Sequence, residues 1–178
     1  TAILEIKSNF KVLDLGCGCG IIGIALMKAI PNIEMHCSDF DSNSVENTKK
    51  NFTFNKLTAD IREGSLFEPW QDIKFDYIVN DVSAISSIIA KNSPWFGEDV
   101  PCDSGEDGSN LTVSIIKKAK NYLKKKGSMQ IPLISLSNVK KIVNVAEENF
   151  SEVKIIKSQD WFLPKEMEIL KDKMNELK

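Results

Sequence analysis

The sequence contains one histidine and only four cysteines among its 178 residues, and these residues are not spaced as metal ligands. Cys17 and Cys19 lie in a short glycine run, whereas Cys37 and Cys102 have no cysteine close to them. This spacing gives neither a zinc motif nor a disulfide framework, so we expect free thiols and no bound metal. A chain of this length buries enough surface to form a core without cross-links, and we expect one domain spanning residues 1–178.

Long apolar runs and a strong net charge are also lacking. No stretch approaches the ~20 apolar residues that span a bilayer, and the first residues lack the pattern of a signal peptide, so we expect a cytoplasmic protein. Lysine and arginine number 23 against 25 aspartates and glutamates, which gives a net charge of −2. This balance provides no bulk electrostatic reason to expect nucleic-acid binding, although a local basic face stays open.

Apolar segments alternate with helical patterns along the chain. The alternation predicts an α/β fold with a doubly wound, mainly parallel sheet, because each crossover must return the chain to the same sheet. Gly127 is expected to end a helix as its C-cap. Strands are expected at residues 12–15, 33–37, 59–62, 75–79, 128–136 and 153–157. Helices are expected at 21–29, 42–54 with Asp41 or Ser42 as its cap, 85–90, 111–126, 139–150 and 165–178.

The most informative segment is the glycine run that joins the first expected strand to the first helix. Its glycines at positions 16, 18 and 20 permit a tight turn and let a ligand approach the backbone N–H groups at the helix start. Residues 18–23 also spell G-x-G-x-x-G, with Asp39 about 20 residues further on, as in dinucleotide-binding proteins. Asp14 stands where a dinucleotide site usually has an apolar residue, and its carboxylate suits a cationic ligand. Asp39 would bind both hydroxyls of a ribose, and Phe40 would lie against a purine.

These residues resemble the signature D-x-G-x-G-x-G of the class I S-adenosylmethionine-dependent methyltransferases, formed here by Asp14, Gly16, Gly18 and Gly20. The similarity extends to about residue 158. It is strongest to the methyltransferase small domain subgroup, which contains release-factor glutamine methyltransferases and small ribosomal RNA guanine methyltransferases. It implies a Rossmann-like fold with a C-terminal helix at the end of the chain. The last antiparallel strand of this fold is expected to be absent or to follow residue 178.

The resemblance also implies the cofactor S-adenosyl-L-methionine and its contacts. Asp14 and the glycine loop would hold the methionine part, and Asp39 the ribose. Ser65 and Leu66 stand where the subgroup has an acid and an apolar residue near the adenine amino group, and serine offers a hydrogen bond without charge. The implied cofactor-binding residues are Asp14, Gly16, Cys17, Gly18, Gly20, Asp39, Phe40, Ser65, Leu66 and Asn80.

The acceptor side departs from this subgroup. Its N-P-P-Y motif is replaced by N-D-V-S at residues 80–83. Asn80 would orient an acceptor and Asp81 would act as a general base, or both residues simply end a strand and cap the next helix. Trp95 and Phe96, in the long loop 93–108, would form an apolar wall for the acceptor, or they anchor a solvated turn. Because this motif is lost, we expect a small-molecule acceptor before a protein side chain, and a protein side chain before RNA.

Other interpretations stay open. Lysines 117, 118, 120, 124, 125 and 126 cluster on one expected helix, either as a solvated face or as a contact for an RNA backbone. Two alternatives for the whole chain are a non-catalytic cofactor-binding module of the same fold and a nicotinamide-dependent oxidoreductase. The second alternative is supported by the G-x-G-x-x-G pattern alone.

Overall fold

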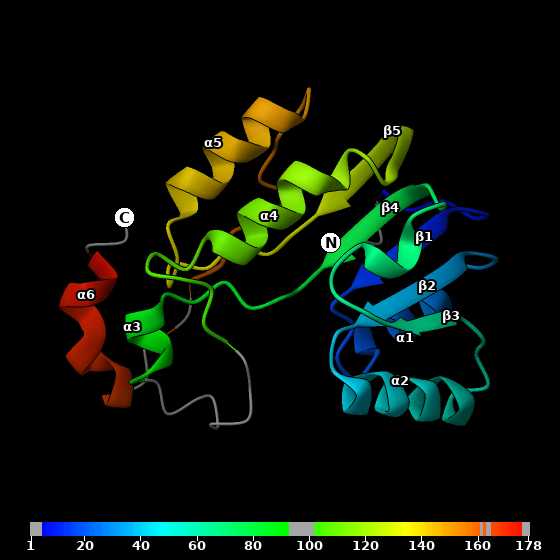
Figure 1. The fold of residues 1–178 in the computed structure, drawn as a ribbon, viewed down its shortest axis with the longest axis horizontal. Coiled ribbons are helices and arrows are strands. Elements are labelled where there is room, and N and C mark those ends of the chain that lie inside the picture. The colour runs from blue at the N-terminus through cyan, green and yellow to red at the C-terminus, as the bar shows by residue number, and fades with distance from the viewer. Residues whose placement is uncertain (1–4, 93–101, 161, 163–164, 176–178) are drawn as a thin grey trace. The chain divides into compact units, whose positions relative to one another are not determined.

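The structure is a computed structural model that describes residues 5–92, 102–160, 162 and 165–175 (Figure 1). The chain divides into two compact units, one formed by residues 1–81 and 118–132 and the other by residues 82–117 and 133–178. The single domain expected from the sequence stays a prediction. Within the described ranges, no helix is both long and apolar enough to cross a lipid bilayer.

A five-stranded parallel sheet forms the centre of the first unit. Its strand order is β3-β2-β1-β4-β5, so the connection that follows β3 takes the chain back past β1 to the other side of the sheet. In open parallel sheets, ligands bind outside the carboxyl ends of the strands at such a reversal, which here lies between β1 and β4. The strands are β1 (Lys11–Leu15), β2 (Glu34–Asp39), β3 (Asp60–Glu63), β4 (Phe75–Asn80) and β5 (Leu123–Gln130).

The inner strands are buried on both faces, as is typical of a parallel sheet. In β1, Val12, Leu13 and Leu15 are each at most 1% exposed, and the buried face continues into β4 through Tyr77 and Ile78. Leu15, at the carboxyl end of β1, pairs with Ser38 of β2 on one side and with Asn80 of β4 on the other. These three strands therefore end together, and polar residues that follow them meet at one edge of the sheet.

Two helices of the first unit follow β1 and β2. Helix α1 (Ile21–Ala29) begins directly after the glycine run, and Gly20 is its N-cap residue. Helix α2 (Ser42–Phe54) is capped by Asp41, whose Oδ2 accepts a hydrogen bond of 2.9 Å from the backbone N–H of Ser44. Both helices agree with the ranges predicted from the apolar spacing and the cap.

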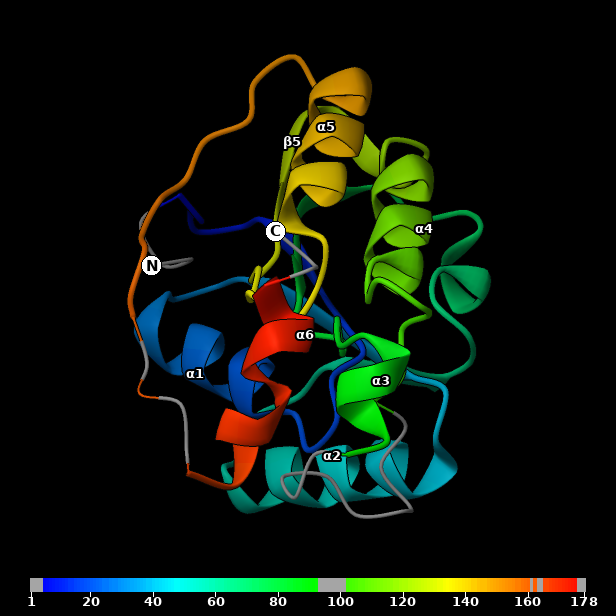
Figure 2. The ribbon, with the colours of Figure 1, turned by 90° about the vertical axis from the view of Figure 1, so that its left-hand side faces the viewer.

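The second unit contains most of the remaining helices. Helix α3 packs against α6 (Figure 2), and the apolar core around them includes Ile89, Leu136 and the stripe Met167, Leu170 and Met174. Two turns of 3-10 helix precede α6, so the C-terminal helix is shorter than the sequence predicts. The elements are α3 (Ser87–Ala90), α4 (Asn110–Ala119), α5 (Val139–Asn149), η3 (Lys165–Leu170) and α6 (Lys171–Asn175).

Three sequence predictions are wrong in the second half of the chain. The strand predicted at residues 128–136 is β5 instead, which begins at Leu123 and ends at Gln130. Gly127 does not cap a helix, because α4 ends at Ala119 and Gly127 lies within β5. A Cβ atom at this position would stand 2.9 Å from the carbonyl oxygen of Phe75, so glycine is needed where the irregular part of β5 approaches β4. The segment 153–157 is not a strand, and residues 151–160 are exposed without regular structure.

Candidate functional site

The glycine run forms a tight turn at the carboxyl end of β1. Gly16, Gly18 and Gly20 adopt positive φ angles of 75°, 54° and 79°, a conformation that side chains with a Cβ atom rarely adopt. The backbone N–H groups of Gly16 and Cys17 donate to the carbonyl oxygen of Ser38, at 2.8 and 3.0 Å. The turn is therefore fixed to the end of β2, and the exposed part of its backbone faces the region where the strands end.

Asp14 is a fully buried carboxylate directly below this turn. Its Oδ2 accepts a hydrogen bond of 3.0 Å from the N–H of Gly23, whereas its Oδ1 has no hydrogen-bond partner among the described residues. Burial raises the pKa of Asp14 from 3.8 to about 7; the negative charges of Asp81 and Asp39 add to this effect, and the hydrogen bond from Gly23 opposes it. A buried oxygen without a donor is costly, so this position favours a ligand that brings a cationic donor.

Asp39 ends β2 beside the same turn. Its Oδ2 accepts from the N–H of Gly18 at 2.9 Å, and its Oδ1 accepts from the N–H of Asp41 at 3.0 Å. These two bonds fix the plane of the carboxylate, and each oxygen keeps a further lone pair for a hydroxyl group. The side chain of Phe40 is 62% exposed, so its ring is free to cover an apolar ligand.

The turn after β3 completes this edge of the sheet. The N–H of Gly64 donates to the carbonyl oxygen of Asp39 at 2.9 Å, which places Ser65 and Leu66 next to the end of β2. Ser65 is exposed, and Leu66 has a φ angle of 49°, which is unusual for a residue with a large side chain. The turn therefore presents a polar and an apolar side chain beside Asp39.

The strand end of β4 supplies the two residues expected to act on the acceptor. Asn80 is 3% exposed, and its Nδ2 donates to the carbonyl oxygen of Leu15 at 2.7 Å. This bond joins the ends of β1 and β4, so Asn80 has a structural role whatever else it binds. Asp81 lies at the surface, and partial burial of its carboxyl group raises its pKa. Its role as a general base stays a prediction.

The arrangement fits the S-adenosylmethionine implied by the sequence resemblance. Binding of S-adenosylmethionine requires a carboxylate for the ammonium group, a carboxylate for the two ribose hydroxyls and an apolar plane for the purine. Asp14, Asp39 and Phe40 meet these requirements at the carboxyl ends of the strands, and Oδ1 of Asp14 has no partner within the described ranges. In the part of the chain that the structure describes, no three histidine, cysteine, aspartate or glutamate side chains gather to hold a metal ion.

The comparisons agree with this interpretation. The family profile "Methyltransferase small domain" matches residues 2–81. These residues belong to the methyltransferase small domain family. A ribosomal RNA small subunit methyltransferase C from Haemophilus ducreyi is 31% identical over 121 residues, which are 68% of this chain and 31% of that protein. A release factor glutamine methyltransferase from Geobacter sulfurreducens is 28% identical over 130 residues, which are 68% of this chain and 44% of that protein.

A solved structure places the fold. A 16S rRNA methyltransferase from T. thermophilus, in complex with AdoMet and guanosine, superimposes with a TM-score of 0.64 at 20% identity, over 86% of this chain and 36% of that chain. The fold is therefore the Rossmann-like fold of the class I methyltransferases, as the sequence predicts. The chain spans less than half the length of these relatives. The preference for a small-molecule acceptor finds no support in the comparisons.

Helix α2 holds the glycine turn in place through two residues that the sequence did not single out. Thr48 Oγ1 donates to the carbonyl oxygen of Gly18 at 2.8 Å, and Asn51 Nδ2 donates to that of Cys19 at 2.8 Å. The Sγ atom of Cys17 lies 3.5 Å from the Thr48 hydroxyl, so its buried side chain contacts α2, and a cofactor contact of Cys17 stays a prediction. Their spacing of three residues on one helix face was the available signal.

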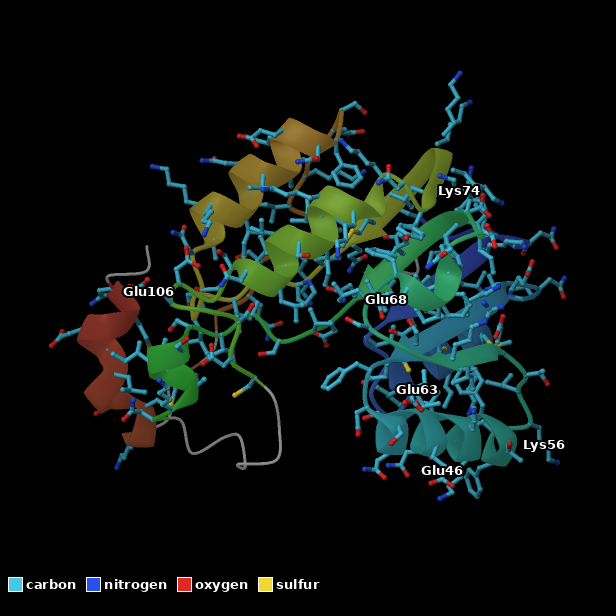
Figure 3. All side chains as sticks on the ribbon, in the orientation of Figure 1. Glu46, Lys56, Glu63, Glu68, Lys74 and Glu106 are labelled. Carbon is cyan, nitrogen blue, oxygen red and sulfur yellow. The ribbon has the colours of Figure 1, made fainter. Side chains whose placement is uncertain are left out.

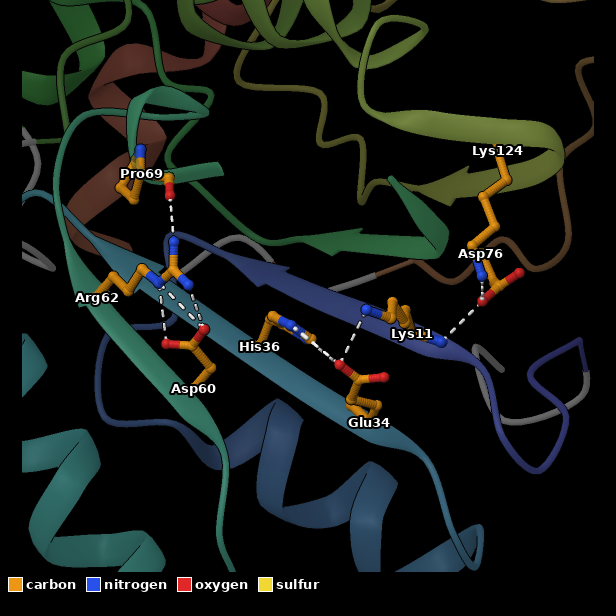
Figure 4. Close-up of polar contacts among 8 residues, drawn as sticks. All are labelled: Lys11, Glu34, His36, Asp60, Arg62, Pro69, Asp76 and Lys124. Atoms are coloured by element: carbon orange, nitrogen blue, oxygen red, sulfur yellow. Dashed lines mark hydrogen bonds and ion pairs between the residues drawn. The ribbon is translucent and has the colours of Figure 1, made fainter. Parts of the chain in front are cut away.

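Trp70 connects the turn after β3 to the glycine loop. Its Nε1–H donates to Ser38 Oγ at 2.9 Å, and the backbone carbonyl of Ser38 accepts the two N–H groups of the loop. The guanidinium of Arg62 lies 4.4 Å above the Trp70 ring. Arg62 also binds both carboxylate oxygens of Asp60 and donates to the carbonyl of Pro69 (Figure 4). These contacts hold the turn that carries Ser65 and Leu66. No local pattern in the sequence indicated these contacts.

Two acceptor-side residues cannot be placed. Trp95 and Phe96, expected to form an apolar wall, lie outside the described residues. Asp103, in the described part of the same loop, accepts hydrogen bonds from Ser87 Oγ at 2.6 Å and from the N–H of Gly105 at 2.9 Å. These bonds lower the pKa of Asp103 and occupy one of its oxygens within its own unit.

Proposed function

We propose that this chain binds S-adenosyl-L-methionine at the glycine turn and transfers its methyl group to a nitrogen of a macromolecule, with ribosomal RNA as the first candidate. The observation that carries the proposal is the Oδ1 of Asp14, which has no hydrogen-bond partner among the described residues, is buried at the strand reversal and feels the negative charge of Asp39. A nicotinamide dinucleotide fits less well, because its pyrophosphate would bring negative charge towards Asp14.

The residues of the site have separate tasks under this proposal. Asp14 binds the ammonium group, Asp39 binds the ribose, and Phe40 with Leu66 covers the adenine, with Ser65 at its polar edge. The cofactor supplies an activated methyl group on its sulfonium, so the protein needs mainly to align the acceptor and exclude water. Asp81, whose pKa is raised by burial, would take up the proton that the acceptor nitrogen releases.

The choice of acceptor rests on the relatives and on Asn80. The curated relatives quoted above are named for ribosomal RNA and for a release-factor glutamine, both of which offer a nitrogen in a planar amine or amide. Asn80 keeps the asparagine of the subgroup motif, but the prolines and the aromatic residue are replaced. The stacking platform must then come from elsewhere, so methylation of a glutamine amide is the second candidate.

Calorimetric titration with S-adenosylmethionine tests the cofactor part. We expect the protein to bind the cofactor and Asp39→Ala to weaken binding at least tenfold, because two charge-assisted hydrogen bonds to the ribose are lost. Asp72→Ala is the matched control, since Asp72 is an exposed acid outside the site, and it should bind as the unchanged protein does. Absence of binding to the unchanged protein would overturn the proposal.

Transfer of a labelled methyl group tests the acceptor part. Ribosomal RNA, deproteinised and incubated with enzyme and labelled cofactor, should gain label, and Asp81→Asn should reduce the rate by 10²-fold or more if Asp81 is the base. Label on a release factor instead would favour the second candidate. Tight cofactor binding without transfer to RNA, protein or small amines would identify a non-catalytic module.

A further inference from the structure

The charge of this protein is distributed very unevenly along the chain. Residues 108–146 contain eight lysines and no aspartate or glutamate, so this stretch carries a charge of +8 in a chain whose net charge is −2. The remaining 139 residues therefore carry −10. Such a separation of charge within one chain is typical of proteins that bind a polyanion through one surface.

Five of these lysines lie together at the amino-terminal edge of the sheet. The sequence analysis expected them on one helix, but the structure places Lys118 at the end of α4, Lys120 in the following turn and the other three at the start of β5. We call Lys118, Lys120, Lys124, Lys125 and Lys126 the amino-edge lysine cluster.

The contacts around the cluster fix it next to the start of β4. Phe75 pairs with Leu123, and its N–H donates to the carbonyl of Tyr122 at 2.8 Å. Lys74 Nζ donates to the carbonyl of Asn121, so a further lysine adjoins the cluster, at the β4 and β5 end shown in Figure 3. The cluster and Lys74 therefore belong to one surface of the first unit.

Most of the positive charge in the cluster is not neutralised. Lys124 pairs with Asp76 at 2.6 Å (Figure 4), but Lys118, Lys120, Lys125 and Lys126 form no ion pair with any described residue, and all four are exposed. By contrast, several lysines elsewhere in the described structure have acidic partners, such as Lys50 with Glu46. Like charges close together in the sequence raise the local positive potential, and a bound polyanion would lower this electrostatic cost.

We propose that the amino-edge lysine cluster binds the phosphate backbone of RNA. Lysines carry compact point charges on flexible stems, which suit phosphates and read no base sequence. The cluster has no exposed aromatic residue within it, which agrees with backbone contact rather than base stacking. The identity of the polyanion as RNA rests on the proposed function, whereas the binding itself is measured without methyl transfer.

The position of the cluster sets a minimum length for the RNA. The cluster adjoins the amino end of β4, and Asn80 with Asp81 lies at its carboxyl end, six residues further along the strand. At about 3.3 Å per residue this separation is about 20 Å, which corresponds to about six nucleotides at 3.4 Å each. An acceptor of one or two nucleotides would not reach the cluster, whereas an RNA of about 20 nucleotides would.

Fluorescence anisotropy with a labelled 20-nucleotide RNA at low salt tests this proposal. The variant carries Lys118→Gln, Lys120→Gln, Lys125→Gln and Lys126→Gln. We expect this variant to bind the RNA at least tenfold more weakly than the unchanged protein. The slope of log K against log salt concentration should become less steep by up to about 3, because up to four phosphate contacts are lost. The matched control removes the same charge from α1, α2 and the turn after α2, at Lys28, Lys49, Lys50 and Lys56. Its RNA affinity should stay within about twofold of the unchanged protein.

The outcomes separate this proposal from the proposed function. Equal loss in both variants, or no binding of RNA by the unchanged protein, would overturn the lysine cluster as an RNA surface. Binding of anionic vesicles or an acidic peptide through the same lysines, without RNA binding, would overturn RNA as the partner. Cofactor titration of the four-lysine variant should match the unchanged protein, so a failure of RNA binding would leave the cofactor site intact.

Discussion

Replacing Asp14 with asparagine should change how the stability of the cofactor-free protein depends on pH. The pKa of Asp14 is raised from 3.8 to about 7, above all by burial. The folded protein therefore holds this proton more tightly than the unfolded chain does, so ionisation of Asp14 destabilises the fold as the pH rises from about 4 to about 7. A shift of about three pKa units corresponds to about 4 kcal/mol in total.

Urea unfolding at pH 5 and pH 8 measures this effect. Over that interval the unchanged protein should lose about 2.5 kcal/mol of its free energy of unfolding through Asp14, because part of the shift already acts below pH 5. Asp14→Asn lacks the titrating group and should not show this loss, even if its absolute stability also changes. Asp72→Asn, at an exposed acid, should follow the unchanged protein. If Asp14→Asn loses as much stability as the unchanged protein, the reasoning about the buried carboxylate is wrong.

Three further predictions concern the same site. Cofactor affinity, measured by calorimetry, should rise about fivefold from pH 6 to pH 7, because only ionised Asp14 attracts the cation, and a flat profile would contradict this. Gly20→Ala should cost about 3 kcal/mol in urea unfolding and Gly18→Ala only about 1 kcal/mol, since a Cβ at Gly20 would stand 2.8 Å from an α2 side chain and one at Gly18 would meet nothing within 4 Å. Trp70→Phe and Ser38→Ala should each destabilise the protein, with a double-mutant coupling of about 1 kcal/mol, and full additivity would show that their hydrogen bond contributes nothing.

The first half of the fold was predictable because its signals are local. Strands β1 and β4 consist mainly of apolar residues, and α2 is capped by Asp41, one of the two cap residues that the sequence offered. The glycine turn was predictable for the same reason, since positive φ angles at Gly16, Gly18 and Gly20 depend on residue type at those positions. The family profile match to residues 2–81 covers this same part of the chain.

The second half was less predictable because its elements depend on partners. Residues 153–157 have the β-branched composition of a strand, but a strand needs an edge to pair with, and the described structure gives them none. The lysines before Gly127 suit a helix, but pairing with β4 draws them into β5. In both cases the tertiary pairing decided the local structure.

The sequence by itself determined the chemistry that this protein offers to a ligand: a glycine turn, a carboxylate before it and another at the end of the next strand. Only the tertiary structure decided the energetic state of these groups. It left Oδ1 of Asp14 buried without a hydrogen-bond partner in the part of the chain that the structure describes. It also fixed Asp39 through two backbone N–H groups and held the turn with Thr48 and Trp70. The physical reason is that burial and long-range hydrogen bonds are properties of packed neighbours, which residue order does not specify locally.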